Sequence, residues 1–492
     1  MLALPARPQR ASVNAALIAV FLTAFTSLLV VAGGPAIRLA VAIAVGFLLV
    51  TLARIQPALG IIATFVYLVV LGMLRRVLLG ASDWISGDPL LLVAPFVALL
   101  LIARAFALEH RPIAPDAISW LVILLLGITF AEVFNPYGGG IAAGVAGLVF
   151  MAFPLFWFFP GREYLRDVDI ERIMGVVVAL GIVVAVYGLW QLFLGHPPWD
   201  QQWLELPSTM EYSSLNVGGE IRAFASFASF GEYGLFLATA LVVCVWFVTR
   251  GKLVALLPIP LLGAALFLSG GRQPLLLGFL GVVVMLGLRT GGPRKALVVT
   301  SAALVLAAGA AVASGPLLST VGANSGAFVG RQLGAIADPL DPNSSTLLIH
   351  LELAFAGIKT GVTHPIGLGT AATNNAAGVG SSEVREKALD TDITLGQDSS
   401  GTDIDISNAF VSFGAGGGVL FVVIILTTLA TAIRAFFRGH AELLPVIGVL
   451  VANLGYWGNG GNYALAALVW MLVGVVAARG RQSRAAARAP AA

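Results

Sequence analysis

The sequence predicts an all-α, polytopic membrane protein with about 14 transmembrane helices and one large extracytoplasmic loop. Hydrophobic residues make up 58% of the 492-residue chain and charged residues only 11%, whereas a soluble domain carries about 25% charged residues. The mean hydropathy is +0.94. Apolar runs of the length that crosses a bilayer, about 20 residues, recur along the whole chain. We therefore expect one integral membrane domain over residues 1–492, with residues 315–407 as the large loop.

The predicted helices are the apolar runs, each bounded by polar or turn-forming residues. The run at 14–33 lacks a small-residue cleavage pattern, so we interpret it as a retained first helix rather than a signal peptide. The expected spanning segments are 14–33, 36–53, 57–74, 89–107, 116–134, 139–159, 173–195, 225–249, 253–269, 273–289, 295–314, 408–433, 441–457 and 461–479.

The basic residues are sorted between the two sides of this topology. With the N-terminus in the cytoplasm, most of the 28 Lys and Arg residues fall in the termini and the cytoplasmic loops, as the positive-inside rule requires. Both termini are therefore expected in the cytoplasm, and the long loops 196–222 and 315–407 on the outer side. Within the second loop, Thr346–Thr360 has helical apolar spacing and predicts an interfacial helix that lies on the membrane.

The sequence lacks the features of several function classes. Cys244 is the single cysteine, so neither an intrachain disulfide nor a cysteine metal site can form. It contains no nucleotide-binding loop, DxD motif, haem ligand pair or nucleic-acid patch. We expect no cofactor, no metal and no nucleic-acid partner, and no direct use of ATP or of a nucleotide sugar.

Two isolated arginines mark predicted helix starts on the outer side. Arg272 ends the turn Ser269-Gly-Gly-Arg272, whose glycines let a polar headgroup approach and whose helix start adds anion affinity. Arg222 opens the segment Arg222-Ala-Phe-Ala-Ser-Phe, and Glu232 follows inside the next helix. Planar guanidinium groups suit phosphate. We expect both arginines to bind an anion, and Glu232 either to orient that anion or to accept a proton. The alternatives are an interfacial anchor for Arg222 and a tight turn with a stray charge for Arg272.

The large loop carries a second set of polar candidates. His364-Pro-Ile-Gly-Leu-Gly-Thr has the Pro and Gly density of a defined turn. His364 and His350 are each either structural or proton acceptors. Arg331 is a third outer arginine.

A third set lies at and beyond the end of that loop. Asp405-Ile-Ser-Asn408 enters a Gly-rich helical segment, so Asp405 is either an N-cap or a carboxylate poised over a cavity as a base or hydroxyl binder. The aromatic and amide-rich turn from Tyr456 to Tyr463 is typical of a membrane interface; stacking of sugars on its rings is the alternative.

These motifs, in this order, resemble the O-antigen ligase and O-antigen polymerase (Wzy-like) superfamily of bacterial membrane glycosyltransferases. The resemblance covers about residues 170–435. It consists of the Arg-x-x-x-x-Phe segment at Arg222, the Ser-x-x-Arg turn at Arg272, the Pro-x-Gly-x-Gly segment after His364, and the segment with Asn408 that enters a Gly-rich helix.

The resemblance implies a substrate, a reaction and a location. The donor would be a polyprenyl-pyrophosphate-linked oligosaccharide, and an acceptor sugar hydroxyl would attack its anomeric carbon without a metal. By position, Arg222 and Arg272 would clamp the pyrophosphate. The protein would lie in the bacterial inner membrane, with a chain-length regulator and a flippase as candidate protein partners.

The chain departs from the ligase pattern in three places. Ser407 stands where ligases carry a histidine before Asn408, His350 stands where many relatives carry an arginine, and Glu232 replaces a common asparagine. The general base stays open among Asp405, His350, His364 and Glu232.

We therefore predict a polymerase of lipid-linked oligosaccharide repeat units, for exopolysaccharide, capsule or O-antigen, because the ligase-type histidine is missing. The alternatives are an O-antigen ligase and a transporter or flippase of lipid-linked sugars; the grouping of charges at one face favours an enzyme. The predicted catalytic residues are Arg272, Arg222, Asp405 and Glu232. The predicted substrate-binding residues are Arg331, His350, His364, Asn408 and Ser269.

Overall fold

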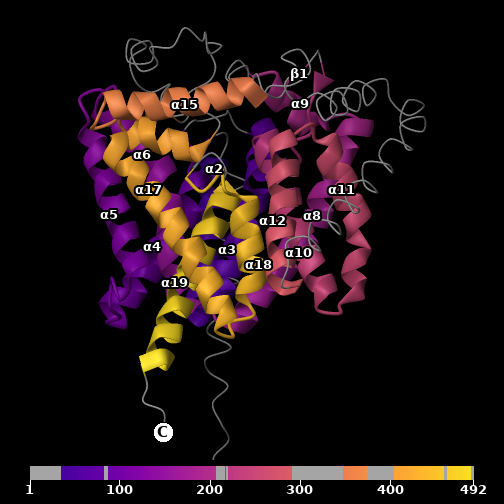
Figure 1. The fold of residues 1–492 in the computed structure, drawn as a ribbon. Coiled ribbons are helices and arrows are strands. Elements are labelled where there is room, and N and C mark those ends of the chain that lie inside the picture. The colour runs from indigo at the N-terminus through magenta and orange to yellow at the C-terminus, as the bar shows by residue number, and fades with distance from the viewer. Residues whose placement is uncertain are drawn as a thin grey trace, which may run out of the picture.

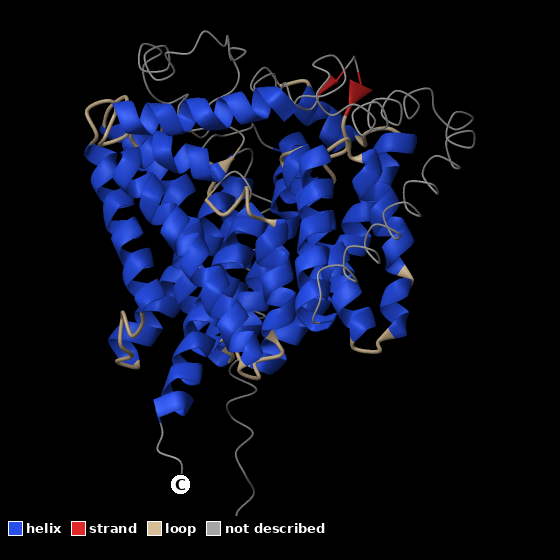
Figure 2. Cartoon of the chain, viewed as in Figure 1, coloured by secondary structure: helices blue, strands red, loops and turns tan. Residues whose placement is uncertain are grey.

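A computed structural model of the chain describes residues 35–81, 87–206, 216–217, 220–290, 347–373, 404–458 and 463–488, and this part is almost entirely helical (Figures 1 and 2). Ten of its helices are long and apolar enough to cross a membrane. The prediction of an all-α, polytopic membrane protein is therefore confirmed. Two short strands, β1 (Asn216–Val217) and β2 (Glu220–Ile221), form an antiparallel pair.

Most of the described helices up to α12 are joined by short connections. In chain order they are α2 (Pro35–Ile55), α3 (Pro57–Val77), α4 (Leu90–Ala103), α5 (Ala117–Ala131), α6 (Ile141–Phe156), α7 (Phe158–Tyr164), α8 (Asp167–Phe193), α9 (Pro198–Leu204), α10 (Phe230–Thr249), α11 (Pro258–Leu268), α12 (Arg272–Thr290), α15 (Leu347–Thr363), α17 (Asp405–Phe437), α18 (Leu443–Ala452) and α19 (Tyr463–Arg488). Single turns of other helix types lie at Leu78–Ala81, Arg104–Leu108, Glu132–Phe134 and Leu253–Leu256.

The observed helices match most of the predicted spanning segments. Each of the ten long helices coincides with one predicted segment, as do the two shorter apolar helices Leu253–Leu268 and Leu443–Ala452. The predicted segments 14–33 and 295–314 lie outside the described residues, as do much of the loop 315–407 and both ends of the chain. The total of 14 helices, the extent of the loop and the side on which the termini lie stay predictions.

Helix α19 forms the centre of the bundle. Of its most apolar window, 94% is buried inside the protein, against 28% for α2 at the periphery. Hydropathy does not explain this difference, because both helices carry long uncharged runs, Leu39–Ala53 in α2 and Tyr463–Ala478 in α19, and a helix that is apolar all round is either buried in protein or faces lipid. Helix α19 packs on α7, α17 and α6.

Helix α15 lies across one end of the bundle, opposite the end from which the C-terminal part of α19 projects (Figure 1). We call this end the α15 end. The helix prediction for Thr346–Thr360 is confirmed. Leu353 and Thr360 are buried, and α15 packs on α17. Leu351, Phe355 and Val362 are exposed, so the helix has one packed face and one open apolar face.

Helix α18 is shorter than predicted. The segment 441–457 was expected to span the membrane, but the helix covers only Leu443–Ala452, about 15 Å of rise against a hydrocarbon thickness of about 30 Å. The chain then continues as a buried turn in which Asn453 and Trp457 are fully covered. Irregular backbone at such a depth needs partners within the protein. The Asn453 side chain donates to Thr239 Oγ1 at 3.0 Å, and Trp457 Nε1 donates to Leu450 O at 3.2 Å.

Candidate functional site

The turn that follows α18 is bound by the first residues of α17 and α12. The backbone N–H of Asp405 donates to Gly455 O at 2.9 Å, and the Gly458 N–H donates back to Asp405 Oδ2 at 2.7 Å. The same turn also contacts the start of α12, where the Tyr456 hydroxyl donates to Oε1 of Gln273, the residue after Arg272. Segments that are 183 residues apart in the sequence therefore meet at this turn.

Glu232 links the starts of α10 and α19. Its side chain is buried, and Oε1 accepts hydrogen bonds from the backbone N–H groups of Ala464 at 2.9 Å and Leu465 at 3.5 Å. Ser229 in turn caps α10 by accepting from the Glu232 N–H at 3.1 Å. A carboxylate at a helix start satisfies open N–H groups and the positive end of the helix dipole. Glu232 is thus the cap of α19; whether it also orients a substrate stays a prediction.

The Ser269-Gly-Gly-Arg272 turn packs against the start of α10. Ser269 is buried; its hydroxyl donates to Leu266 O at 2.7 Å and accepts from the Gly271 N–H at 3.3 Å. A side chain at Gly234 would meet Pro274 at 3.0 Å from its Cβ. The helix begins at Arg272 itself, so this arginine stands in the first turn of α12.

Four helix N-termini therefore converge at one place, those of α10, α12, α17 and α19. Each helix start carries roughly half a positive charge and open N–H groups. The Glu232 and Asp405 carboxylates offset part of this charge, while the segments with Arg222 and Arg272 add to it, so the region holds both cationic groups that suit an anion and carboxylates.

Arg222 lies above an aromatic ring at the start of α10. Its guanidinium carbon is 4.1 Å from the centre of the Phe230 ring, a distance at which the cation and the ring attract each other. The backbone between them is irregular, and Ala225 has a left-handed φ of 47°. A non-glycine residue holds such a conformation only where its surroundings enforce it.

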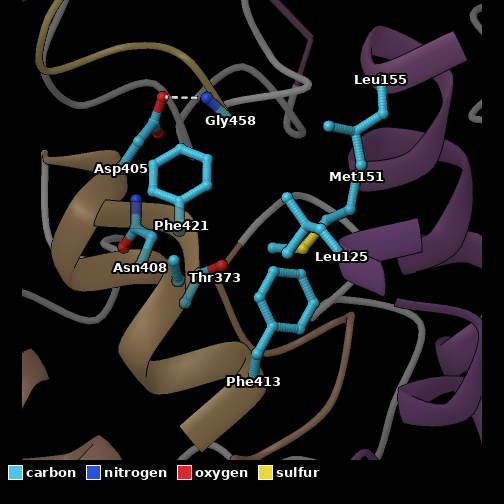
Figure 3. Close-up of a pocket in the computed structure, with 10 residues that line it drawn as sticks. Leu125, Met151, Leu155, Thr373, Asp405, Asn408, Phe413, Phe421 and Gly458 are labelled. Atoms are coloured by element: carbon cyan, nitrogen blue, oxygen red, sulfur yellow. Dashed lines mark hydrogen bonds between the residues drawn. The ribbon is translucent and has the colours of Figure 1, made fainter. Parts of the chain in front are cut away.

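Asp405 and Asn408 form the polar end of a small pocket (Figure 3). Thr373 adds a hydroxyl, while Leu125 from α5, Met151 and Leu155 from α6, and Phe413 and Phe421 from α17 supply apolar walls. The volume open to the centre of a water molecule is about 30 Å³, which suffices for about two waters. The pocket as it stands is too small for a sugar ring.

Helix α17 is broken near the pocket. Gly414 has φ 68° and ψ −173° within the helix, which interrupts the backbone ladder and leaves the carbonyls of Val411 and Ser412 without their helical donors. The Leu368 N–H donates to Val411 O at 2.9 Å and the Gly369 N–H to Ser412 O at 3.1 Å. The Pro-x-Gly-x-Gly segment after His364 thus replaces the missing helical hydrogen bonds, a role that the sequence did not indicate.

Close backbone contact explains the glycines of this joint. A Cβ at Gly414 would lie 2.0 Å from Pro365 O, and one at Gly367 would lie 2.3 Å from Ser412 O. Both residues also have positive φ, 68° and 72°, where glycine alone is unstrained.

Among the remaining predicted site residues, the structure describes the side chain of His364. His364 Nδ1 lies 3.2 Å from Thr363 Oγ1 and 3.3 Å from Thr360 O, and its ring meets Tyr137 edge to face at 5.9 Å. It does not line the pocket of Asp405. His350 is in α15, but its side chain and the whole of Arg331 lie outside the described residues. The structure therefore brings Asp405 and Asn408 together at the pocket, with Glu232 and the segment of Arg272 around the adjacent turn.

The sequence analysis missed two buried ion-pair clusters at the same end. Arg38 and Arg75 both bind Asp88, at 2.6 and 3.0 Å, and Arg76 binds Asp200 at 2.6 Å. Asp88 and Asp200 lie in segments that were predicted on the outer side, as does the end of α3 with Arg75 and Arg76. This common location could have indicated the ion pairs, because arginines inside a membrane protein usually pair with acidic groups or backbone carbonyls.

His196 lies beside the second cluster, in the connection between α8 and α9. Its ring stacks on Phe224 with a centroid separation of 5.4 Å and an interplanar angle of 23°. Burial lowers the pKa of His196 below its ordinary value, although nearby Asp200 opposes this effect. The ring is therefore kept neutral more readily than an exposed histidine.

In the part of the chain that the structure describes, no group of three or more His, Cys, Asp or Glu side chains is arranged to hold a metal ion. Comparison with family models, with curated proteins and with solved structures finds no match for this chain. Functional interpretation therefore rests on the residues and their arrangement.

Proposed function

We propose that this chain is a membrane glycosyltransferase that polymerises lipid-linked oligosaccharide repeat units at the outer face of the bacterial inner membrane, with both termini in the cytoplasm. The donor is a glycan on polyprenyl pyrophosphate, and the acceptor is a sugar hydroxyl of a second unit. The resemblance to the Wzy-like superfamily motivates the proposal.

The observation that carries this proposal is the convergence of four helix N-termini with the two arginine segments at the α15 end. Asp405 is anchored to the turn at their centre by the 2.7 Å bond from Gly458. Two arginines and several helix starts suit a pyrophosphate, while a neighbouring carboxylate suits a hydroxyl. The arrangement thus offers separate places for the leaving group and the nucleophile.

The proposed reaction follows from these places. The acceptor oxygen attacks the anomeric carbon and forms the new glycosidic bond, while its proton passes to the Asp405 carboxylate. The bond from the anomeric carbon to pyrophosphate breaks, and the electron pair leaves with the lipid carrier. Arg222 and Arg272 stabilise the negative charge of that leaving group, a contribution that preorganised cations supply before the reaction begins. Since the pocket at Asp405 admits about two waters, acceptor binding must widen it.

The test is complementation of a deletion strain, followed by sizing of the glycan on its lipid carrier. Arg222→Ala and Arg272→Ala should abolish polymer while the protein remains in the membrane, and single repeat units should accumulate on the carrier. Arg272→Lys should also fail substantially, because an ammonium cannot form the planar bidentate contact. Arg438→Ala is the matched control, since Arg438 is exposed after the last residue of α17, far from its start at Asp405.

Other outcomes would support the alternative functions. Long polymer that stays on the carrier in the deletion strain would indicate a ligase. Repeat units trapped on the cytoplasmic face would indicate a transporter. Normal polymer in the Arg272→Ala strain would remove the central claim for this site.

A further inference from the structure

The segment that carries Arg222 into α10 is held by hydrogen bonds from several other elements to its backbone groups. Gln191 Oε1 accepts from the N–H groups of Phe224, at 3.1 Å, and Ala225, at 2.7 Å. The Ser226 carbonyl accepts from the Met73 N–H at 2.9 Å. Irregular backbone buried at a membrane protein's core persists only with such a set of partners.

Arg76 supplies the other contacts to this segment. Its guanidinium is buried, and it donates to the carbonyls of Phe227, at 2.6 Å, and Ala225. The same group donates to Asp200 Oδ1 at 2.6 Å and lies 4.8 Å above the Phe224 ring. One side chain therefore holds the carbonyl of the left-handed residue Ala225 and that of Phe227, two residues later.

A second layer of contacts fixes Arg76 and Gln191 relative to each other. Asp200 is fully buried, and its Oδ2 accepts from Gln191 Nε2 at 2.7 Å and from the Tyr187 hydroxyl at 2.6 Å. The two side chains that hold the segment are thus joined through one carboxylate. A change at any member loosens the conformation of the backbone next to Arg222.

We propose that Arg76 is a positioning residue that fixes the backbone from which Arg222 projects and so sets the direction of the Arg222 guanidinium. The importance of that direction for catalysis rests on the proposed function, but the positioning itself does not. Arg75, the preceding residue of α3, offers a matched control, because it is also buried and also paired with an aspartate, Asp88, at 3.0 Å.

The positioning can be measured with a thiol reporter. Cys244 is the single cysteine and is buried, so Arg222→Cys in a Cys244→Ser background places one reactive thiol at the position of interest. The full-length protein in nanodiscs would be labelled with a membrane-impermeant maleimide, with and without Arg76→Lys or Arg75→Lys. Lysine keeps the charge beside Asp200 but cannot hold two carbonyls and a carboxylate in one plane.

We expect Arg76→Lys to raise the labelling rate about tenfold, because loss of a charged hydrogen bond shifts a local opening equilibrium by at least that factor. Arg75→Lys should leave the rate unchanged. An unchanged rate with Arg76→Lys, or an equal rise with Arg75→Lys, overturns the proposal. Gln191→Met removes the acceptor of the Phe224 and Ala225 N–H groups and should raise the labelling rate similarly. This second variant tests the proposal if Arg76→Lys fails to fold.

The glycan assay separates this inference from the proposed function. In chains with wild-type Arg222 and Cys244, Arg76→Lys should reduce polymer and Arg75→Lys should not. A raised labelling rate with normal polymer would leave the positioning role intact and contradict the catalytic role of Arg222. Normal labelling with reduced polymer would contradict the positioning role.

Discussion

The Glu232 carboxylate accepts a hydrogen bond from the backbone N–H of Ala464 at 2.9 Å, which ties the first turn of α10 to the first turn of α19. Because the amide oxygen of a glutamine can accept the same bond, we expect Glu232→Gln to retain both fold and polymer synthesis. Glu232→Ala leaves buried N–H groups open and should destabilise the protein by about 1–3 kcal/mol.

Thermal unfolding of the purified variants and glycan length in complemented cells check this expectation. If Glu232→Gln is well folded but makes no polymer, the negative charge or proton affinity of Glu232 is required, and the capping role alone is insufficient.

Asp405→Asn, unlike Glu232→Gln, should strongly reduce polymer synthesis while the fold is retained. Its amide oxygen can still accept from the Gly458 N–H, so the protein should reach the membrane at normal levels, but the amide cannot take a proton. We expect polymer synthesis to fall by about 100-fold or more, measured as repeat units transferred by purified protein in nanodiscs.

Asp116→Asn is the control for a purely structural effect of this change. Asp116 caps α5 by accepting from the Ser119 N–H at 2.9 Å, and it does not line the pocket. Full activity of the Asp405→Asn protein would exclude Asp405 as the base.

Gly414→Ala should destabilise the protein strongly. The new Cβ would lie 2.0 Å from Pro365 O at a φ of 68°, and strain in the left-handed region alone costs about 1–2 kcal/mol. Gly416→Ala serves as the comparison, because its Cβ would meet nothing within 4 Å, and alanine in a helix gains up to about 1 kcal/mol over glycine. Melting temperatures of the two variants should move in opposite directions; a Gly414→Ala protein as stable as wild type would contradict the break in α17.

The buried ring of His196 predicts a pH dependence of stability. Because its pKa is lower in the folded than in the unfolded protein, the unfolded chain binds more protons as the pH falls below about 6.5, the unfolded pKa. The stabilising contribution is thus present above that pH and is lost as the pH falls through the folded pKa. Thermal unfolding at about pH 7.5 and pH 5.5 measures the loss. His196→Phe keeps an aromatic ring on Phe224 and should shrink the difference; an unchanged difference would assign the effect to another group.

Composition predicted the bundle well because a membrane span is a property of run length. It failed at α18, where Leu454, Tyr456 and Trp457 continue the apolar run beyond the last helical residue, Ala452. Hydropathy indicates that a segment is buried but not whether it is helical, because a buried turn is as apolar as a buried helix. The Gly-rich segment after Asp405 was evident in the sequence, but the break at Gly414 was not, because a run of glycines does not show which of them leaves the helical conformation.

The sequence indicated which residues belong to the candidate site, but not which residues they contact. Asp405 and Asn408 do share a pocket, and Asp405 does stand at a helix start. The partners of other residues are remote in the chain: Glu232 binds a helix 232 residues later, and Arg76 binds Asp200 across 124 residues. No local pattern records such pairs, because the bundle topology alone brings them together.

The break at Gly414 separates the turns that bear Asp405 from the rest of α17. Above Gly414, the turns that bear Asp405 are fastened to the α15 segment by Leu368, Gly369 and the bond from Ser407 to Ala354 O at 3.0 Å. Helix α17 as a whole also packs on α5, α18 and α19. The turns before Gly414 are therefore bonded both to the α15 segment and, through Asp405, to the turn that follows α18. Asp405 thus belongs to a junction of three chain segments, and a shift of any one of them requires the hydrogen bonds to the other two to adjust.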